Sequence, residues 1–215
     1  MHDWTRRVAV MGMIAMVTVG ARAQAQAWNY PTFQGPRVVS REFNFAVAYG
    51  GDGGTDVFAQ WREGLDATNQ LEVEGGFASP RSGNARGLLG GSYAHQITTA
   101  TADLPLDLLF TVGLYDSFGD GNFFRLPVGV SAGHTFPLNN GMSITPYVHP
   151  RLSFDASGCC DKLGLEFDLG LNFQLTEQFA ARLSGTFGGS DVAANDPGFG
   201  IGLAWSPKGL RGAQH

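Results

Sequence analysis

The chain has 215 residues, including 31 Gly and 16 Phe, with 15% charged residues and a formal net charge of -5. This modest negative charge argues against nucleic-acid binding, which requires clustered Lys and Arg side chains. Low charge together with abundant Gly and aromatic residues is typical of a protein whose largest surface faces something other than water.

The N-terminus has the layout of a secretory signal peptide. The charged stretch MHDWTRR precedes the apolar run VAVMGMIAMVTVGA, and the small-residue stretch ARAQAQA follows. A membrane anchor is the alternative, but the apolar run is shorter than the roughly 20 residues that a spanning helix needs. We therefore predict a signal peptide over residues 1–27, cut after Ala23, Ala25 or Ala27, and a periplasmic lead-in over residues 28–37.

The rest of the chain alternates between apolar and hydrophilic residues with a period of two. In LGLEFDLGLNFQL, residues 163–175, Leu and Phe fall on one face of a strand, and Gly, Glu, Asp, Asn and Gln fall on the other. Two less regular segments are counted as strands because their neighbours need partners. The ten predicted strands lie within 39–49, 56–65, 69–78, 87–97, 104–115, 123–136, 142–154, 163–175, 179–187 and 198–205.

Short turns and longer loops rich in Gly, Asp and Asn alternate between these strands. In outer-membrane barrels the short turns lie on the periplasmic side, so both ends of an even-stranded barrel would lie there. Eight strands are the alternative if one irregular hairpin is periplasmic. Turn chemistry explains the acidic loop residues more simply than cation or lipopolysaccharide binding does.

A water-soluble sandwich or lipocalin-like barrel would also alternate, with its apolar face inward and charges outside. Here the apolar face is broad, bulky and nearly uncharged, and the other face is rich in Gly, Ser and Thr. A lipid-facing band has these properties. Aromatic residues also gather near strand ends, as expected at a membrane interface. Those residues are Tyr49, Trp61, Phe77, Tyr115, Phe123, Phe136, Phe154, Phe179 and Trp205.

Residues 38–206 resemble the small bacterial outer-membrane β-barrel proteins of the OmpA, OmpX and OmpW kind. The closing segment GFGIGLAW, with Gly200 and Trp205, is similar to the C-terminal strand signal that the barrel-assembly machinery reads. Residues 207–215 follow it as a periplasmic tail, a departure from the usual pattern in which the chain ends on the aromatic residue. The resemblance implies an all-β, closed antiparallel transmembrane barrel in the outer membrane. It also implies a monomer in contact with outer-membrane lipids, lipopolysaccharide and the assembly machinery.

Charges of both signs are predicted to point into the lumen, where a charge is costly unless it is paired. Paired charges would close a narrow lumen, which favours a structural or surface-interaction role without a cofactor or metal. The many inward Gly, Ser and Thr residues favour an alternative, a narrow passive channel for small solutes. The predicted polar network consists of Glu42, Arg62, Glu72, Glu74, Asp107, Arg125, His149, Arg151, Glu166, Asp168 and Arg182.

A third hypothesis is a lipid-modifying enzyme. A three-residue turn at 139–141, with Gly141 in the left-handed conformation, pairs Leu138 with Met142 and places Ser131 opposite His149. One register of the next hairpin pairs Arg151 with Glu166 and His149 with Asp168. Ser131, His149 and Asp168 would then lie side by side in the order that an ester hydrolase requires, although a polar network would also satisfy His149.

Cys159 and Cys160 are the only cysteines and lie next to each other in a predicted loop. In an oxidising compartment they are candidates for a vicinal disulfide, with pairing between molecules as the alternative. Metal binding is disfavoured because no His or further Cys is nearby in the sequence.

Overall fold

The computed structural model describes residues 32–50, 54–80, 83–119, 123–138, 141–157, 161–190 and 197–207. These residues form ten long antiparallel strands and one strand of two residues, β7. The strands are β1 (Arg41–Tyr49), β2 (Thr55–Gly64), β3 (Asn69–Ser79), β4 (Arg86–Thr98), β5 (Asp107–Phe118), β6 (Phe123–Gly133), β7 (Phe136–Pro137), β8 (Ser143–Ser157), β9 (Asp161–Gln174), β10 (Phe179–Gly189) and β11 (Gly198–Trp205).

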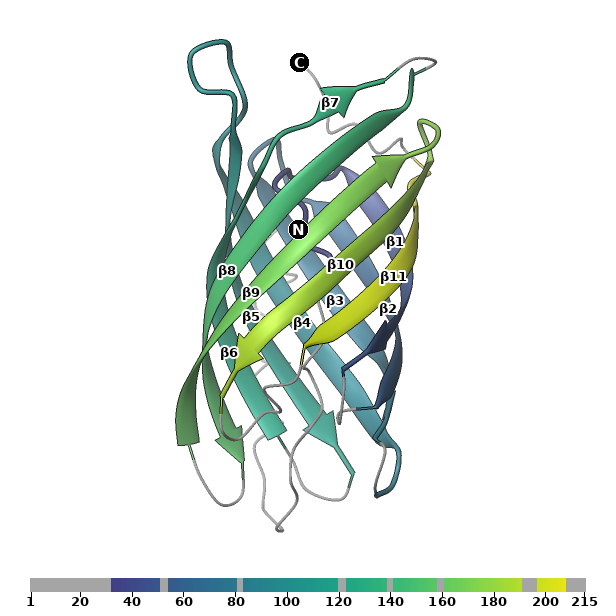
Figure 1. The fold of residues 1–215 in the computed structure, drawn as a ribbon, viewed down its shortest axis with the longest axis vertical. Coiled ribbons are helices and arrows are strands. Elements are labelled where there is room, and N and C mark those ends of the chain that lie inside the picture. Colours follow the sequence, from purple (N-terminus) through teal and green to yellow (C-terminus); the bar gives the residue numbers. More distant parts are fainter. Residues whose placement is uncertain are drawn as a thin grey trace, which may run out of the picture.

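The sheet closes on itself, so the ten long strands make a barrel whose strands are tilted against its long axis (Figure 1). The first and last strands pair along their length, from Phe43 opposite Trp205 to Tyr49 opposite Phe199. Strand β6 pairs with β8, and β7 adds only a short pairing to the end of β8. The ten-stranded prediction is therefore confirmed, and the eight-stranded alternative is wrong.

The barrel is apolar outside and polar inside. Phe45 is 62% exposed on the outer face, whereas its inward-pointing neighbour Asn44 is 0% exposed. The same alternation runs through β2 and β11, where every second residue is buried. Hydrocarbon cannot hydrogen-bond to the backbone, so a closed ladder of strands with apolar outward side chains is a stable way to cross it. The predicted inward phase of the charged residues is confirmed, as is the outward phase of Leu163, Leu165, Phe167 and Leu169.

The first strand begins and the last strand ends at the same rim of the barrel. We call the rim at Arg41 and Trp205 the terminal rim, and the rim at Tyr49 and Gly198 the distal rim; the terminal rim is uppermost in Figure 1. At the terminal rim Phe43 stacks on Trp205 with ring centroids 5.6 Å apart. Exposed aromatic rings at this level fit the interfacial belt that the sequence predicts.

Two residues of the predicted aromatic belt point the other way. Tyr115 and Phe123 are buried inside the barrel rather than exposed at its outer surface. Tyr115 has the same parity as the inward residues Asp107 and Thr111 in β5, so extending the period of two would have placed it correctly.

The turns at the terminal rim have the predicted chemistry. The amide of Leu138 donates to the carbonyl of Met142 at 2.8 Å, and Gly141 has a φ of 77°, which favours glycine. In the β2–β3 turn, Asp66 accepts hydrogen bonds from Asn69 and Thr68. These bonds, that from the Asn69 side chain foremost, lower the pKa of Asp66 to about 2.

One predicted long loop at the distal rim, between β8 and β9, is shorter than expected. Strand β8 runs to Ser157 and β9 begins at Asp161, so part of the expected loop is strand. Three acidic residues assigned to loops also lie within strands. Asp155 is buried in β8, Asp116 lies in β5 and Asp161 is the first residue of β9. The regular alternation simply continues past the points where Gly and Asp suggested turns.

Several predictions fall outside the described residues. The signal peptide, the first part of the lead-in, the Cys159 and Cys160 pair and the tail from residue 208 onward belong to this group. In the described part of the chain no helix is long and apolar enough to cross a membrane.

A charge placed on the lipid-facing surface should destabilise the barrel. Ile201 lies near the middle of β11 and is 52% exposed on the outer face. We expect Ile201→Arg to lower the free energy of unfolding by about 2–4 kcal/mol, because hydrocarbon does not solvate the guanidinium group. Urea titration of the protein refolded into lipid vesicles measures this change. Leu65→Arg, in an exposed turn, is the matched control, and equal losses in both variants would contradict the lipid-facing assignment.

The Asp66 hydrogen bonds should make the β2–β3 turn sensitive to acid. Because the folded-state pKa is lowered, the ionised carboxylate contributes stability above its unfolded pKa of about 4, and this contribution is lost as the pH falls through about 2. We expect the protein to be more stable than Asp66→Asn at neutral pH, and we expect this difference to disappear only as the pH falls below 2. Urea titrations of both proteins across this range test the expectation, and a difference that does not change with pH would refute it.

Candidate functional site: the barrel lumen

The structure places all eleven residues of the predicted polar network inside the barrel, where each is at most 4% exposed. Nine of them form ion pairs with one another, and these pairs make two networks in the lumen. The other two, Glu74 and Asp107, have separate partners. The lumen is thus a polar core rather than an apolar one.

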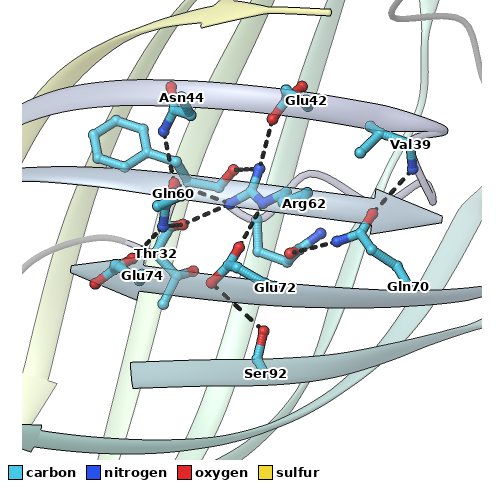
Figure 2. Close-up of polar contacts among 12 residues, drawn as sticks. Thr32, Val39, Glu42, Asn44, Gln60, Arg62, Gln70, Glu72, Glu74 and Ser92 are labelled. Carbon is cyan, nitrogen blue, oxygen red and sulfur yellow. Dashed lines mark hydrogen bonds and ion pairs between the residues drawn. The ribbon is translucent and has the colours of Figure 1, made fainter. Parts of the chain in front are cut away.

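The first network consists of side chains from four strands. Arg62 of β2 lies between Glu42 of β1 and Glu72 of β3, each of which is its register partner (Figure 2). Arg182 of β10 reaches over β11 to pair with Glu42. It can do so because its partner on β11 is Gly202, which has no side chain to obstruct it. We call this set the arginine–glutamate network.

Amide side chains extend the arginine–glutamate network towards the distal rim. Gln60 accepts a hydrogen bond from Asn44 and donates one to Glu74, and it also accepts one from Arg62 at 3.2 Å (Figure 2). Asn44 and Gln60 are fully buried. They satisfy buried charges without adding charge, which a closed interior requires.

The second network joins β6, β8 and β9. Arg125 contacts both carboxylate oxygens of Asp155, at 2.7 and 2.9 Å, and one oxygen of Glu166 at 2.6 Å. Arg151 continues the chain, with Glu166 at 3.0 Å and Asp168 at 2.8 Å. The predicted register, Arg151 opposite Glu166 and His149 opposite Asp168, is confirmed. We call this set the β8–β9 network.

The residues just before β1 lie inside the barrel and connect the two networks. The carbonyl of Thr32 accepts from Gln60 at 3.0 Å and from Arg62 at 3.1 Å. The Thr32 hydroxyl donates to Asp168 at 3.1 Å and lies 3.1 Å from Nδ1 of His149. Residues 32–37 were expected to be a periplasmic lead-in, but they occupy the lumen because buried charges there still need partners. We call Thr32–Val39 the inner segment.

Phe33 anchors the inner segment. Its carbonyl accepts from Arg62 at 3.1 Å and from Arg182 at 3.2 Å, and its ring is fully buried. Its φ of 54° is unusual for a bulky residue and costs about 1–3 kcal/mol, so the surrounding contacts must hold it there. The centroid of its ring lies 6.0 Å from that of Phe58, and the ring packs in a buried apolar cluster.

Side chains from the wall hold the rest of the inner segment. Ser131 donates to the carbonyl of Gln34 at 2.8 Å. Gln96 donates to the carbonyl of Pro36 and accepts from the amide of Val38, both at 2.9 Å. Gln70 accepts from the amide of Val39 at 3.0 Å (Figure 2). These bonds satisfy the backbone of a segment that belongs to no strand.

A buried apolar layer adds to the closure of the lumen. It consists of the side chains of Phe33, Ala46, Ala48, Phe58, Ala78, Leu88, Tyr115 and Phe123. Aromatic and aliphatic side chains packed across the interior leave little room for water.

Two cavities remain beside the inner segment. A cavity of about 370 Å³ at the terminal rim borders Gln34, Arg37, Glu42, Asn172 and Arg182. Nε of Arg37 lies 3.5 Å from Oδ1 of Asp107. A second cavity, of about 20 Å³, borders Thr32, Thr111 and His149, among others, and has room for about one water molecule. The inner segment thus separates a wide entrance from a nearly filled interior.

Ser131, His149 and Asp168 lie close together in the lumen, and each of them is hydrogen-bonded to the inner segment. Register partners on both sides of Ser131 and His149 confirm that these two residues are opposite each other. The Ser131 hydroxyl nevertheless donates to Gln34, and the His149 ring nitrogens lie 3.1 Å from the hydroxyl of Thr32 and 2.9 Å from that of Thr111. The serine is therefore engaged by the inner segment rather than by a general base.

The other histidines and the acidic residues do not form a metal site in the described part of the chain. No group of three or more His, Cys, Asp or Glu side chains there has the arrangement of metal ligands. His95 is exposed on the outer face, and its Nδ1 lies 2.9 Å from Oδ1 of Asn69. The ring of His134 packs edge-on against the ring of Phe136.

The predictions from the sequence include neither the inner segment nor Asp155 among the lumen contacts. Asp155 continues the inward parity of Arg151 and Ser153, so the period of two could have identified it. The inner segment carries no periodic signal, because its contacts are made to residues far away along the chain, such as Asp168 and Arg182.

No family model matches the chain, and no curated protein matches it. Solved structures, in contrast, do match the chain. The β domain of the Bordetella autotransporter BrkA is similar over 78% of this chain and 99% of its own, with 8% identity and a TM-score of 0.51. A bacterial polysaccharide outer membrane secretin is similar over 74% of this chain, with 10% identity and a TM-score of 0.50, and the match spans 57% of the secretin chain.

The fold is that of a bacterial outer-membrane β-barrel. At such low identity the comparisons establish the fold and leave the activity open. They support the outer-membrane location that the sequence predicts. The apolar outer face and the polar lumen of this outer-membrane barrel agree with that location.

Breaking the arginine–glutamate network should strongly destabilise this outer-membrane barrel. We expect Arg62→Leu to lower the free energy of unfolding by about 3–5 kcal/mol, because Glu42 and Glu72 would lose a shared buried partner. Arg41→Leu is the matched control, because the ion pair of Arg41 with Glu63 is partly exposed to water. Urea titration in lipid vesicles compares the two variants. Similar, small losses in both would show that the buried pairs do not carry the stability of the lumen.

Proposed function

We propose that this barrel is a closed outer-membrane protein with a structural or surface-interaction role, acting as a monomer among outer-membrane lipids and lipopolysaccharide. The observation that carries the proposal is the filled lumen. The two ion-pair networks, the inner segment that joins them and the buried apolar layer occupy the interior, beside a terminal-rim cavity of about 370 Å³ and one of about 20 Å³. A path for solutes would need these buried groups to separate.

Charge balance in the lumen supports the closed state. Each arginine in the two networks contacts at least one carboxylate, and Arg125 and Arg151 share Glu166. Opening the lumen by moving one strand would separate charges that are buried away from water, which is costly. The ion pairs therefore act as cross-links between neighbouring strands.

A narrow passive channel is the second candidate, and one observation favours it. The inner face of β11 carries only small residues, Gly198, Gly200, Gly202 and Ala204. The wall itself therefore leaves space along this strand, and Phe33 of the inner segment fills that space at Gly200. The choice between a closed barrel and a channel depends on whether the segment stays in place.

Electrical recording tests the proposal directly. We expect the mature chain, beginning at Trp28 and refolded into planar bilayers, to produce no discrete current steps in concentrated KCl. Folding and insertion are checked separately by circular dichroism and by the altered gel mobility of unheated samples. A refolded open porin recorded in the same bilayers is the positive control. Stable steps from the correctly folded protein would reject the closed state in favour of the channel.

A further inference from the structure

We infer that the inner segment is a displaceable gate, and that its withdrawal turns the closed barrel into a channel for small hydrated ions along the inner faces of β1 and β11. This inference rests on the proposed closed state of the full chain. It adds a second state with a different activity, and it identifies the part of the molecule that separates the two.

The barrel wall is complete without the inner segment. Strand β1 begins at Arg41 and pairs with β2 and β11 along its length, so the closing ladder lies entirely outside Thr32–Val39. Most bonds that hold the segment run from its backbone and the Thr32 hydroxyl to side chains of the wall. The Arg37 side chain also pairs with Asp107 of β5. Withdrawal would therefore exchange these bonds for bonds to water and leave the sheet intact.

The wall is shaped to hold the Phe33 ring. A Cβ atom added to Gly200 would lie 2.7 Å from Cζ of Phe33 and 3.1 Å from Cβ of Ala48. Gly200 is therefore glycine where the ring needs its space. Ala46 and Ala48 on β1 are also small, so removing the ring leaves a strip of wall beside Gly200 without bulky side chains.

The strip continues into open space at the terminal rim. The 370 Å³ cavity borders Gln34 and Gly35 of the inner segment together with Ala180 and Arg182 of β10. Towards the distal rim the inner face of β11 ends in Gly198, again without a side chain. A path along β11 would thus begin in an existing cavity, pass the Arg182–Glu42 ion pair that crosses the strand at Gly202, and continue past Gly200 and Gly198.

Withdrawal would also give the path a polar lining. Arg62 and Arg182 would lose the carbonyls of Thr32 and Phe33, and Asp168 would lose the Thr32 hydroxyl. These groups keep their ion-pair partners, so the networks would not be left with unpaired charge. The hydrogen-bonding groups set free would face the path and bind water, as in a hydrated channel.

The decisive experiment compares the mature chain with a variant that lacks residues 28–37 and so begins at Val38, which keeps the bond from Val38 to Gln96. Both proteins are refolded and recorded in planar bilayers with KCl on both sides. We expect discrete current steps from the shortened chain and none from the mature chain. A synthetic peptide with the sequence of residues 28–37, added on either side, should block the steps.

A second pair of substitutions assigns the path. In the shortened chain Gly200→Leu would place a side chain in the space that Phe33 vacates, and we expect it to reduce the current of each step. Ile201→Leu is the matched control, because Ile201 is the next residue of β11 and points to lipid. If the Gly200→Leu variant folds and the current of each step is unchanged, the assignment of the path to β11 is overturned.

The outcomes separate this inference from the closed-state proposal. Steps of the same size from both chains would overturn the closed state and, with it, the gate. A folded shortened chain that does not conduct would overturn the gate alone. If the shortened chain does not fold, Phe33→Ala in the mature chain decides, since it removes only the ring. Brief openings support the gate, and continuous closure overturns it.

Discussion

Two buried ion-pair networks lie in the lumen, and Thr32 joins them: its carbonyl accepts from Arg62, and its hydroxyl donates to Asp168. Guanidinium groups buried inside a barrel need more hydrogen-bond acceptors than the carboxylates of neighbouring strands supply. The carbonyls of the inner segment provide these acceptors for Arg62 and Arg182. The segment lies in the lumen for this reason, and the closed state of the barrel depends on the same few bonds.

The lipid environment explains why the charges are inside at all. The outer face must be apolar over the width of the membrane, so every charged side chain of a spanning strand must point into the lumen or lie at a rim. Register then decides which charges meet. Glu42, Arg62 and Glu72 become neighbours because the β1–β2 and β2–β3 hairpins place them in one row across the strands.

Small residues complement this polar core. Inward Gly residues on β11 allow Arg182 to reach Glu42 across the strand and allow the ring of Phe33 to lie against the wall. The same absence of side chains that permits the closed arrangement would leave room for water if the inner segment were gone. Closure and potential conduction are therefore two consequences of one feature of the wall, and the position of the inner segment determines which of them prevails.

The sequence by itself determined the strands, their phase and one register. The period of two separates lipid-facing from inward residues, and a three-residue turn ending in Gly141 aligns β8 with the end of β6, because both are properties of local backbone geometry. Only the tertiary structure decided where Thr32–Val39 lies and which partner each buried charge takes. Phe33 and Arg182 are 149 residues apart, and contacts at that separation depend on barrel closure, which leaves no periodic trace in the chain.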